Sequence, residues 1–254
     1  MKAADLPTYY NICEILEHNL EHRGDKIALL SENGSFTFRE VSEQVNRVGN
    51  ALIRSGVQFG ECVAILCPDR PEWVSVFFAT AKIGGVALGL NTLLKTDEYD
   101  YILKDARVKV LVVHDGLKAL VEPIIKKHDT LIKVITVTDN KSIKCTTFTD
   151  WIDEEKSELD SATTHREDFC SLHYSSGTTG VPKGVLHMHK DYPLIAQLSG
   201  VDLFGIAKND RTFSVAKLFF VYGIGGNLIF PWYVGASCVL YAGPPRQAAA
   251  VLKA

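Results

Sequence analysis

Apolar and polar residues follow two different spacings along this chain, and the two spacings alternate. The apolar run Cys62–Leu66 predicts a buried strand that Pro68 ends, and similar runs predict strands at 108–113 and 134–137. Helical spacing fills the stretches between them. The inward face of the helix after the first strand is predicted to consist of Trp73, Phe77, Phe78 and Ala81. Short strands that alternate with helices are typical of an α/β fold with largely parallel pairing.

The N-terminal region carries the signals of a hairpin followed by a helix. The strand-like segments Lys26–Leu30 and Ser35–Phe38 flank an Asn-Gly turn, which is a strong hairpin signal. Thr37 and Glu40 have the spacing of a capping box at the start of a helix. The apolar stripe of that helix is predicted to comprise Val41, Val45, Val48 and Leu52. Gly56 is placed to terminate it.

Two later segments depart from this alternation. Asp150–Glu167 is strongly charged and polar, which predicts a solvated helix and linker. Leu218–Leu240 contains no charged residue and is long enough to cross a bilayer. Five helix-breaking residues interrupt it, namely Gly223, Gly225, Gly226, Pro231 and Gly235. We therefore expect no stable membrane insertion, and predict a buried loop, a short helix and a strand instead.

Composition narrows the class of protein further. With 254 residues, 46% hydrophobic residues and a net charge of −3, the chain can bury a large core and has no basic excess for a nucleic acid. Its six cysteines form no C-x-x-C pair, and no signal peptide begins the sequence. These features favour reduced thiols and a cytoplasmic location. The sequence carries no signal of oligomeric state.

The segment Tyr174–Gly184 has the composition of a polyphosphate-binding loop. Its three glycines, Gly177, Gly180 and Gly184, let backbone amides approach an anion closely. Four hydroxyl groups add donors, on Ser175, Ser176, Thr178 and Thr179. Lys183 supplies a compact positive charge on a flexible stem, and Pro182 stiffens the residue before it.

This loop is predicted to connect two strands. Apolar runs at Phe169–Tyr174 and Val185–Met188 flank it. A kinase-type P-loop is disfavoured, because Pro182 replaces the second glycine and Gly184 replaces the Ser/Thr of that pattern. The alternative is a plain Ser/Gly/Thr-rich surface loop. The ordered string with its lysine after a proline favours phosphate binding.

A second candidate binding segment is Lys217–Gly226, in which aromatic residues are crowded against glycines. Such a segment can shape a flat slot for a planar ligand. By itself it is more typical of a packed core.

A zinc site is a further alternative, because four possible ligands lie close in sequence: Cys170, His173, His187 and His189. Cys170 and His173 have opposite parity on one strand and are expected to point to opposite faces. His187 and His189 share a face, where one of them could approach a substrate or a phosphate, but a packed core histidine is favoured. We assign no metal site to these residues.

The loop string resembles the phosphate-binding signature of the adenylate-forming (AMP-binding) superfamily, which includes acyl-CoA synthetases, aryl-CoA ligases, luciferases and peptide-synthetase adenylation domains. Three further landmarks are similar to the N-terminal domain of that family, namely Gly24–Leu29, Phe36–Val41 and Asn91–Leu94. The sequence of residues 217–226 is similar to that of the matching segment in benzoate-type aryl-CoA ligases. In the segment before Asn91 the family more often has a proline where this chain has Gly89. This difference concerns the local backbone geometry and not the resemblance to the family.

The resemblance implies an acid-thiol ligase that uses ATP, Mg²⁺ and coenzyme A. The carboxylate of an acid, benzoate or a related aromatic acid, attacks the α-phosphate of ATP to give an acyl-adenylate, which then reacts with coenzyme A. The implied phosphate-binding residues are Ser175, Ser176, Gly177, Thr178, Thr179, Gly180 and Lys183, with Lys183 catalytic. Phe220 is implied as the gate of the acyl pocket, lined by Val221, Tyr222 and Gly223. Phe219–Tyr222 has no carboxylate to pair with a buried ammonium group, which disfavours an amino-acid substrate.

The resemblance also implies a domain organisation of two sheets with helices between and around them. Residues 60–190 are expected to form the first subdomain, with 1–59 and 205–254 as parts of the second. The Tyr-Gly-x-Thr-Glu and Tyr-Arg-Thr-Gly-Asp strings of the family do not occur in the chain. We therefore expect a truncated N-terminal domain without the C-terminal domain, inactive by itself. The alternatives are a non-catalytic module that binds phosphate or an aromatic acid, and an adenylate-forming enzyme with a non-CoA acceptor.

Overall fold

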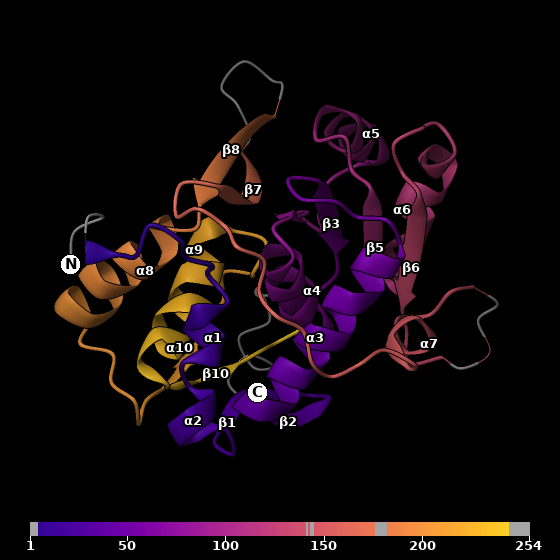
Figure 1. The fold of residues 1–254 in the computed structure, drawn as a ribbon. Helices are drawn as coiled ribbons and strands as arrows, with labels where there is room; N and C mark the ends of the chain where they lie inside the picture. Colours follow the sequence, from indigo (N-terminus) through magenta and orange to yellow (C-terminus); the bar gives the residue numbers. More distant parts are fainter. Residues whose placement is uncertain (1–4, 141, 143–144, 176–181, 244–254) are drawn as a thin grey trace.

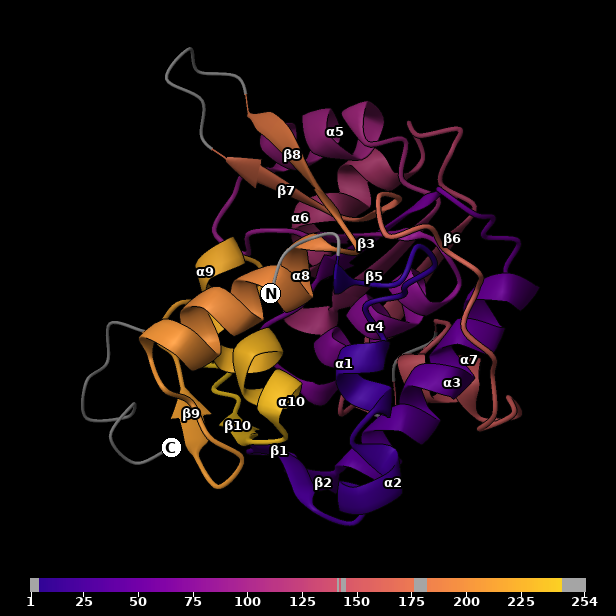
Figure 2. The same cartoon turned by 60° about the vertical axis from the view of Figure 1, so that its left-hand side comes forward.

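The structure is a computed structural model that describes residues 5–140, 142, 145–175 and 182–243. It contains two β-sheets with helices between and around them, as the sequence predicted (Figure 1). Both views place the hairpin β7–β8 at the top of the molecule and the smaller sheet at the bottom (Figures 1 and 2).

The larger sheet has six strands in the order β6-β5-β3-β4-β7-β8. Their bounds are β3 Cys62–Leu66, β4 Val86–Gly89, β5 Val110–His114, β6 Lys133–Val137, β7 Phe169–Ser175 and β8 Lys183–Met188. All neighbours pair in parallel except β7 and β8, which are antiparallel. Every residue of β3 and β4 is buried, as expected for parallel strands covered on both faces.

The helices that cover this sheet are α3 Phe38–Arg54, α4 Pro71–Lys82, α5 Thr96–Asp105, α6 Asp115–Ile125 and α7 Phe148–Ile152. Helix α4 differs from the expectation of a single inward face, because all of its residues except Glu72 are buried. Phe78 stacks on Trp232 of a helix from the far end of the chain, with ring centroids 5.3 Å apart. Helix α4 is therefore enclosed by protein on both sides.

The smaller sheet has the order β2-β1-β10-β9, with β1 Ile27–Ser31, β2 Gly34–Thr37, β9 Arg211–Phe213 and β10 Ser237–Val239. The predicted hairpin is present as the antiparallel pair β1–β2. The capping box is present as well: Thr37 Oγ1 accepts from the Glu40 amide, and Glu40 accepts from the Thr37 amide. Gly56, with φ of 90°, follows the end of α3 as predicted.

The remaining helical segments are short: α1 Glu14–Glu17, α2 Leu20–Arg23, α8 Asp191–Ile195, α9 Val221–Ile224 and α10 Phe230–Val234, with π-helical turns η2 Ala196–Leu203 and η3 Gly225–Ile229. Leu218–Leu240 thus forms a loop, short helical pieces and a strand, as predicted. In the described part of the chain, no helix has the length and apolar character to span a membrane.

The charged segment 150–167 differs from its prediction. Only Phe148–Ile152 is helical, and the chain from Asp153 to Arg166 is irregular. Side chains of α3 hold this irregular part: Asn46 Nδ2 donates to the Ser157 carbonyl at 2.8 Å, and Asn50 Nδ2 donates to the Lys156 carbonyl at 2.9 Å. The segment is therefore fastened to the body rather than simply solvated.

Candidate functional site

The predicted phosphate loop lies between the two strands of the hairpin β7–β8. Ser175 is paired with Lys183, and Tyr174 with Gly184, so the two flanks of the loop are held side by side. The predicted strand-loop-strand arrangement is confirmed. Lys183 is exposed at the start of β8. The loop residues Ser176, Gly177, Thr178, Thr179 and Gly180 lie outside the described residues.

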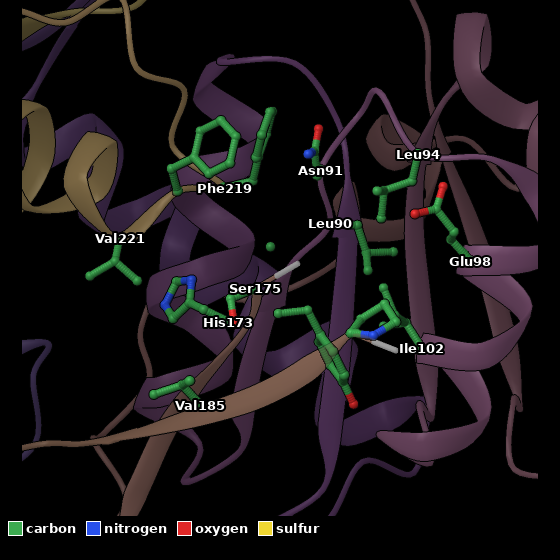
Figure 3. Close-up of a pocket in the computed structure, with 14 residues that line it drawn as sticks. Leu90, Asn91, Leu94, Glu98, Ile102, His173, Ser175, Val185, Phe219 and Val221 are labelled. Atoms are coloured by element: carbon green, nitrogen blue, oxygen red, sulfur yellow. The ribbon is translucent and has the colours of Figure 1, made fainter. Parts of the chain in front are cut away.

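A largely apolar cavity of about 380 Å³ lies beside this hairpin (Figure 3). The hairpin contributes His173, Tyr174, Ser175, Pro182 and Val185, and the end of β4 and the loop after it contribute Gly89, Leu90, Asn91 and Leu94. Helix α5 closes one side with Glu98 and Ile102. The opposite wall is the aromatic segment Phe219–Val221. Glu98 also accepts a hydrogen bond from the Lys95 amide at 2.9 Å, which fixes its carboxylate at the start of α5.

Of the four residues predicted to form the acyl pocket, two line the cavity and two do not. Phe220 and Val221 line the cavity together with Ser175. Tyr222 is 75% exposed and lies outside its lining. Gly223 is buried, and a Cβ there would come within 2.0 Å of the Lys217 carbonyl oxygen. Gly223 therefore permits a close turn of the backbone and presents no surface to this cavity.

Gly89 has a packing reason to be glycine. A Cβ at this position would lie 3.0 Å from Cζ2 of Trp73 and 3.1 Å from Cα of Phe219. The missing side chain lets the backbone of Phe219 lie against the end of β4. The departure from the family's proline thus allows a close approach between two parts of the cavity wall.

His173 lines the cavity, whereas its sequence pattern indicated only a candidate metal ligand. Its Nε2 lies 3.3 Å from the Tyr192 hydroxyl. Burial, assisted by the neighbouring His187, lowers the pKa of His173 to about 4. The imidazole is therefore neutral near pH 7. Because His173 and Ser175 are two apart on one strand, their shared parity was the available signal that both face one side.

The other candidate zinc ligands are not assembled into a site. His189 is fully buried and accepts a hydrogen bond from the Ile12 amide at 3.0 Å through Nδ1, and burial lowers its pKa to about 4. The expected opposite orientation of Cys170 and His173 is wrong: a register shift between Phe169 and Ser171 turns Cys170 toward the core that contains Tyr192. Among the residues described, no three His, Cys, Asp or Glu side chains gather as metal ligands would.

Residues 16–254 match the family model of the AMP-binding enzymes. The chain belongs to that family. The benzoate–CoA ligase of Thauera aromatica is 36% identical over 97% of the chain, and the 4-hydroxybenzoate–CoA/benzoate–CoA ligase of Rhodopseudomonas palustris is 32% identical over 94%. These matches cover 47% and 44% of the two relatives, so the chain spans about half the length of the curated proteins it resembles.

Solved structures of the same family have the same fold. The anthranilate CoA ligase AuaEII in complex with anthranoyl-AMP matches with a TM-score of 0.97 and 53% identity, over 99% of this chain and 49% of that one. A benzoate CoA ligase from Burkholderia xenovorans LB400 matches with a TM-score of 0.87 and 29% identity, over 96% of this chain and 47% of that one.

Proposed function

We propose that the full-length protein that carries this chain activates an aromatic carboxylic acid with ATP and transfers the acyl group to coenzyme A. The observation that carries the proposal is the juxtaposition of an apolar cavity and a phosphate-loop hairpin. The cavity is walled by Phe219–Val221, and the hairpin that borders it carries Ser175 and Lys183 at the two ends of the loop. An acid in the cavity would hold its carboxylate near the phosphates of ATP.

In this proposal the phosphate loop binds ATP as its Mg²⁺ complex. A carboxylate oxygen of the acid attacks the α-phosphorus and pyrophosphate leaves, and the coenzyme A thiolate then attacks the acyl carbonyl and releases AMP. Lys183 offsets the charge of the departing pyrophosphate, and hydroxyl and amide donors of Ser175–Gly180 bind the phosphate oxygens. Such preorganised donors are commonly the largest catalytic contribution.

Two observations support an aromatic acid. The cavity wall is formed largely by apolar side chains, including Leu90, Leu94 and Ile102. The relatives and structural neighbours reported above act on benzoate, hydroxybenzoates or anthranilate, according to their names. Neutral His173 adds a polar group without adding a charge.

The test is acid-dependent exchange of labelled pyrophosphate into ATP by the full-length protein, with benzoate, 2-aminobenzoate, 4-hydroxybenzoate and acetate compared at equal concentration. Thioester formation after addition of coenzyme A is followed by mass spectrometry. We expect exchange with at least one aromatic acid to exceed exchange with acetate, and a matching thioester to form. Exchange without a thioester would indicate a different acceptor, and exchange with acetate alone would contradict an aromatic substrate.

We further propose that the 254-residue chain by itself does not turn over. It spans about half of its curated relatives, and the magnesium- and ribose-binding strings that its resemblance to the family implies do not occur in it. Loss of several electrostatic contributions, each worth roughly a hundredfold in rate, leaves no measurable exchange. The same exchange assay on the purified 254-residue chain tests this, and benzoate-dependent exchange from it would contradict the proposal.

A further inference from the structure

A buried carboxylate supports the wall of the cavity from behind. Asp69 lies in the turn between β3 and α4 and is only 3% exposed. One of its oxygens, Oδ1, accepts a hydrogen bond from the Leu218 amide at 3.0 Å. This bond joins two parts of the chain that are 149 residues apart. Buried carboxylates are costly unless they are paired in this way.

The residue before Leu218 is held from the other sheet. Lys217 is 8% exposed, and its ammonium group donates to the carbonyl of Tyr241 and lies 4.8 Å from the centroid of the Tyr241 ring. Tyr241 follows β10 of the smaller sheet. Lys217 and Leu218 are thus anchored to the smaller and the larger sheet respectively, directly ahead of the cavity wall.

The wall itself has little room to move independently of these anchors. The Cα of Phe219 packs against Gly89, where even one added methyl group would crowd it. The rings of Phe219 and Phe220 lie 4.6 Å apart, and both residues line the cavity. A displacement of the Leu218 amide would therefore be transmitted to the surface that meets the acid.

We propose that Asp69 is a positioning residue for the acyl site, which sets the place of Phe219 and Phe220 through its hydrogen bond to the Leu218 amide. The inference rests on the proposed function, since it names what determines the shape of that same cavity. Ionised carboxylate accepts more strongly than the neutral acid. The positioning is therefore strongest when Asp69 is charged.

The surroundings of Asp69 make this contact sensitive to pH. Burial raises the pKa of Asp69 to about 6, although the Leu218 amide and the charge of Lys217 act in the opposite direction. The Cys67 thiol also interacts with Asp69, and burial keeps that thiol neutral by raising its pKa. The guanidinium of the adjacent Arg70 is engaged by Glu72 and Asp139. Acidification through pH 6 is expected to neutralise Asp69 and loosen the Leu218 amide.

The effect on folding has the opposite sign, which separates positioning from simple stabilisation. A carboxyl group with a folded pKa of about 6 and an ordinary value of 3.8 binds its proton first in the folded state. Its contribution to stability is complete below pH 3.8 and is lost as the pH rises through 6. Protonation of Asp69 at low pH therefore increases the stability of the folded state, while it weakens the hydrogen bond to the Leu218 amide.

The first experiment measures exchange of the Leu218 amide by NMR in the 254-residue chain, corrected for intrinsic exchange rates. The variants are Asp69→Asn, which keeps an acceptor but cannot titrate, Asp69→Ala, and the control Asp139→Asn. We expect protection in the wild type and the control to fall several-fold from pH 7 to pH 5, to stay constant in Asp69→Asn, and to be lost in Asp69→Ala. Constant protection in the wild type over this range would overturn the proposal.

The second experiment measures kinetics of the full-length protein. Loss of the buried hydrogen bond in Asp69→Ala is expected to raise KM for the aromatic acid about tenfold while KM for ATP stays unchanged. Asp69→Asn should restore KM at pH 7 and show no rise toward pH 5.5. Equal effects on both substrates, or no rescue by Asn, would contradict positioning. Absent activity with the expected amide exchange would contradict only the proposed function.

Discussion

Burial keeps two histidines of this protein neutral near pH 7, although they lie in different parts of the fold. His173 borders the cavity and His189 packs against the N-terminal segment, and burial lowers the pKa of each to about 4. Neither imidazole carries a charge near pH 7, so neither would serve as a counter-charge for phosphate there. Residue type alone could not distinguish these roles, because the pKa depends on neighbours contributed by distant parts of the chain.

The folded pKa of His189 predicts an acid-sensitive contribution to stability. With 6.5 as the ordinary value and about 4 in the fold, the contribution is complete above pH 6.5 and decreases as the pH falls toward 4. We expect the wild type to lose about 2 kcal/mol through this group between pH 7 and pH 5. His189→Asn, which retains an acceptor for the Ile12 amide, should lose correspondingly less. Urea unfolding of the 254-residue chain at the two pH values measures this, with exposed His22→Asn as the control.

If the wild type, His189→Asn and His22→Asn all lost the same free energy of unfolding between pH 7 and pH 5, the role given to His189 would be contradicted.

Gly89 yields a second prediction at the residue scale. Gly89→Ala would press a methyl group against the Phe219 backbone and Trp73, and we expect a loss of about 1–3 kcal/mol of stability. Gly226→Ala is the matched control, since no heavy atom outside its chain neighbours and its own helix backbone lies within 4 Å of the Cβ it would add. Urea midpoints of the two variants provide the comparison. Equal stability of both would show that the wall yields to the added methyl group.

Elements with local signals were predictable, and elements made by distant contacts were not. The β1–β2 hairpin and the start of α3 follow from an Asn-Gly turn and a capping box, which act within a few residues. The π-helical turn Ala196–Leu203 has no such signal. It packs on α10, where a Cβ on Gly200 would lie 2.9 Å from Cβ of Phe230. Its geometry therefore depends on a partner 30 residues away.

The conformation of the irregular segment after α7 also depends on contacts with residues that are distant in sequence. Asn50 donates to the carbonyls of Lys156 and Glu158, at 2.9 and 3.1 Å. Asn50→Ala would remove both donors, and we expect it to cost about 1–2 kcal/mol and to expose the bond after Lys156 to trypsin. Limited proteolysis with peptide mapping measures this, with Glu43→Ala on the exposed side of α3 as the control. Unchanged cleavage at Lys156 would show that other contacts hold the segment.

At the scale of the whole molecule, the candidate site is a meeting point of segments that are far apart in sequence. Gly89 ends a strand of the larger sheet, and Ser175 and Lys183 flank the predicted phosphate loop. Phe220 precedes helix α9, and Val221 is its first residue. The sequence could identify the two segments by their composition and by family resemblance. It could not show that Val221 borders the cavity while neighbouring Tyr222 does not, because that depends on how α9 packs.

In the proposed function, the acid and ATP contact different segments of the chain, which leads to a prediction about mutations in each segment. In the full-length protein, Val221→Ala enlarges the acid side of the cavity, so we expect the ratio of kcat/KM between benzoate and 2-aminobenzoate to change about tenfold or more. Lys183→Ala removes a charge on the phosphate side, so we expect kcat to fall about a hundredfold for every acid without a change in their order. Lys190→Ala is the matched control. It removes a lysine near β8 whose ammonium group pairs with Glu167 at 2.8 Å, and it should leave both quantities unchanged.

The double variant Val221→Ala/Lys183→Ala tests whether the two sites are independent. Because they use different side chains, the two effects should add. Reordered acid preferences in Lys183→Ala, or a uniform loss in Val221→Ala, would show that the hairpin and the aromatic wall act on the same substrate group.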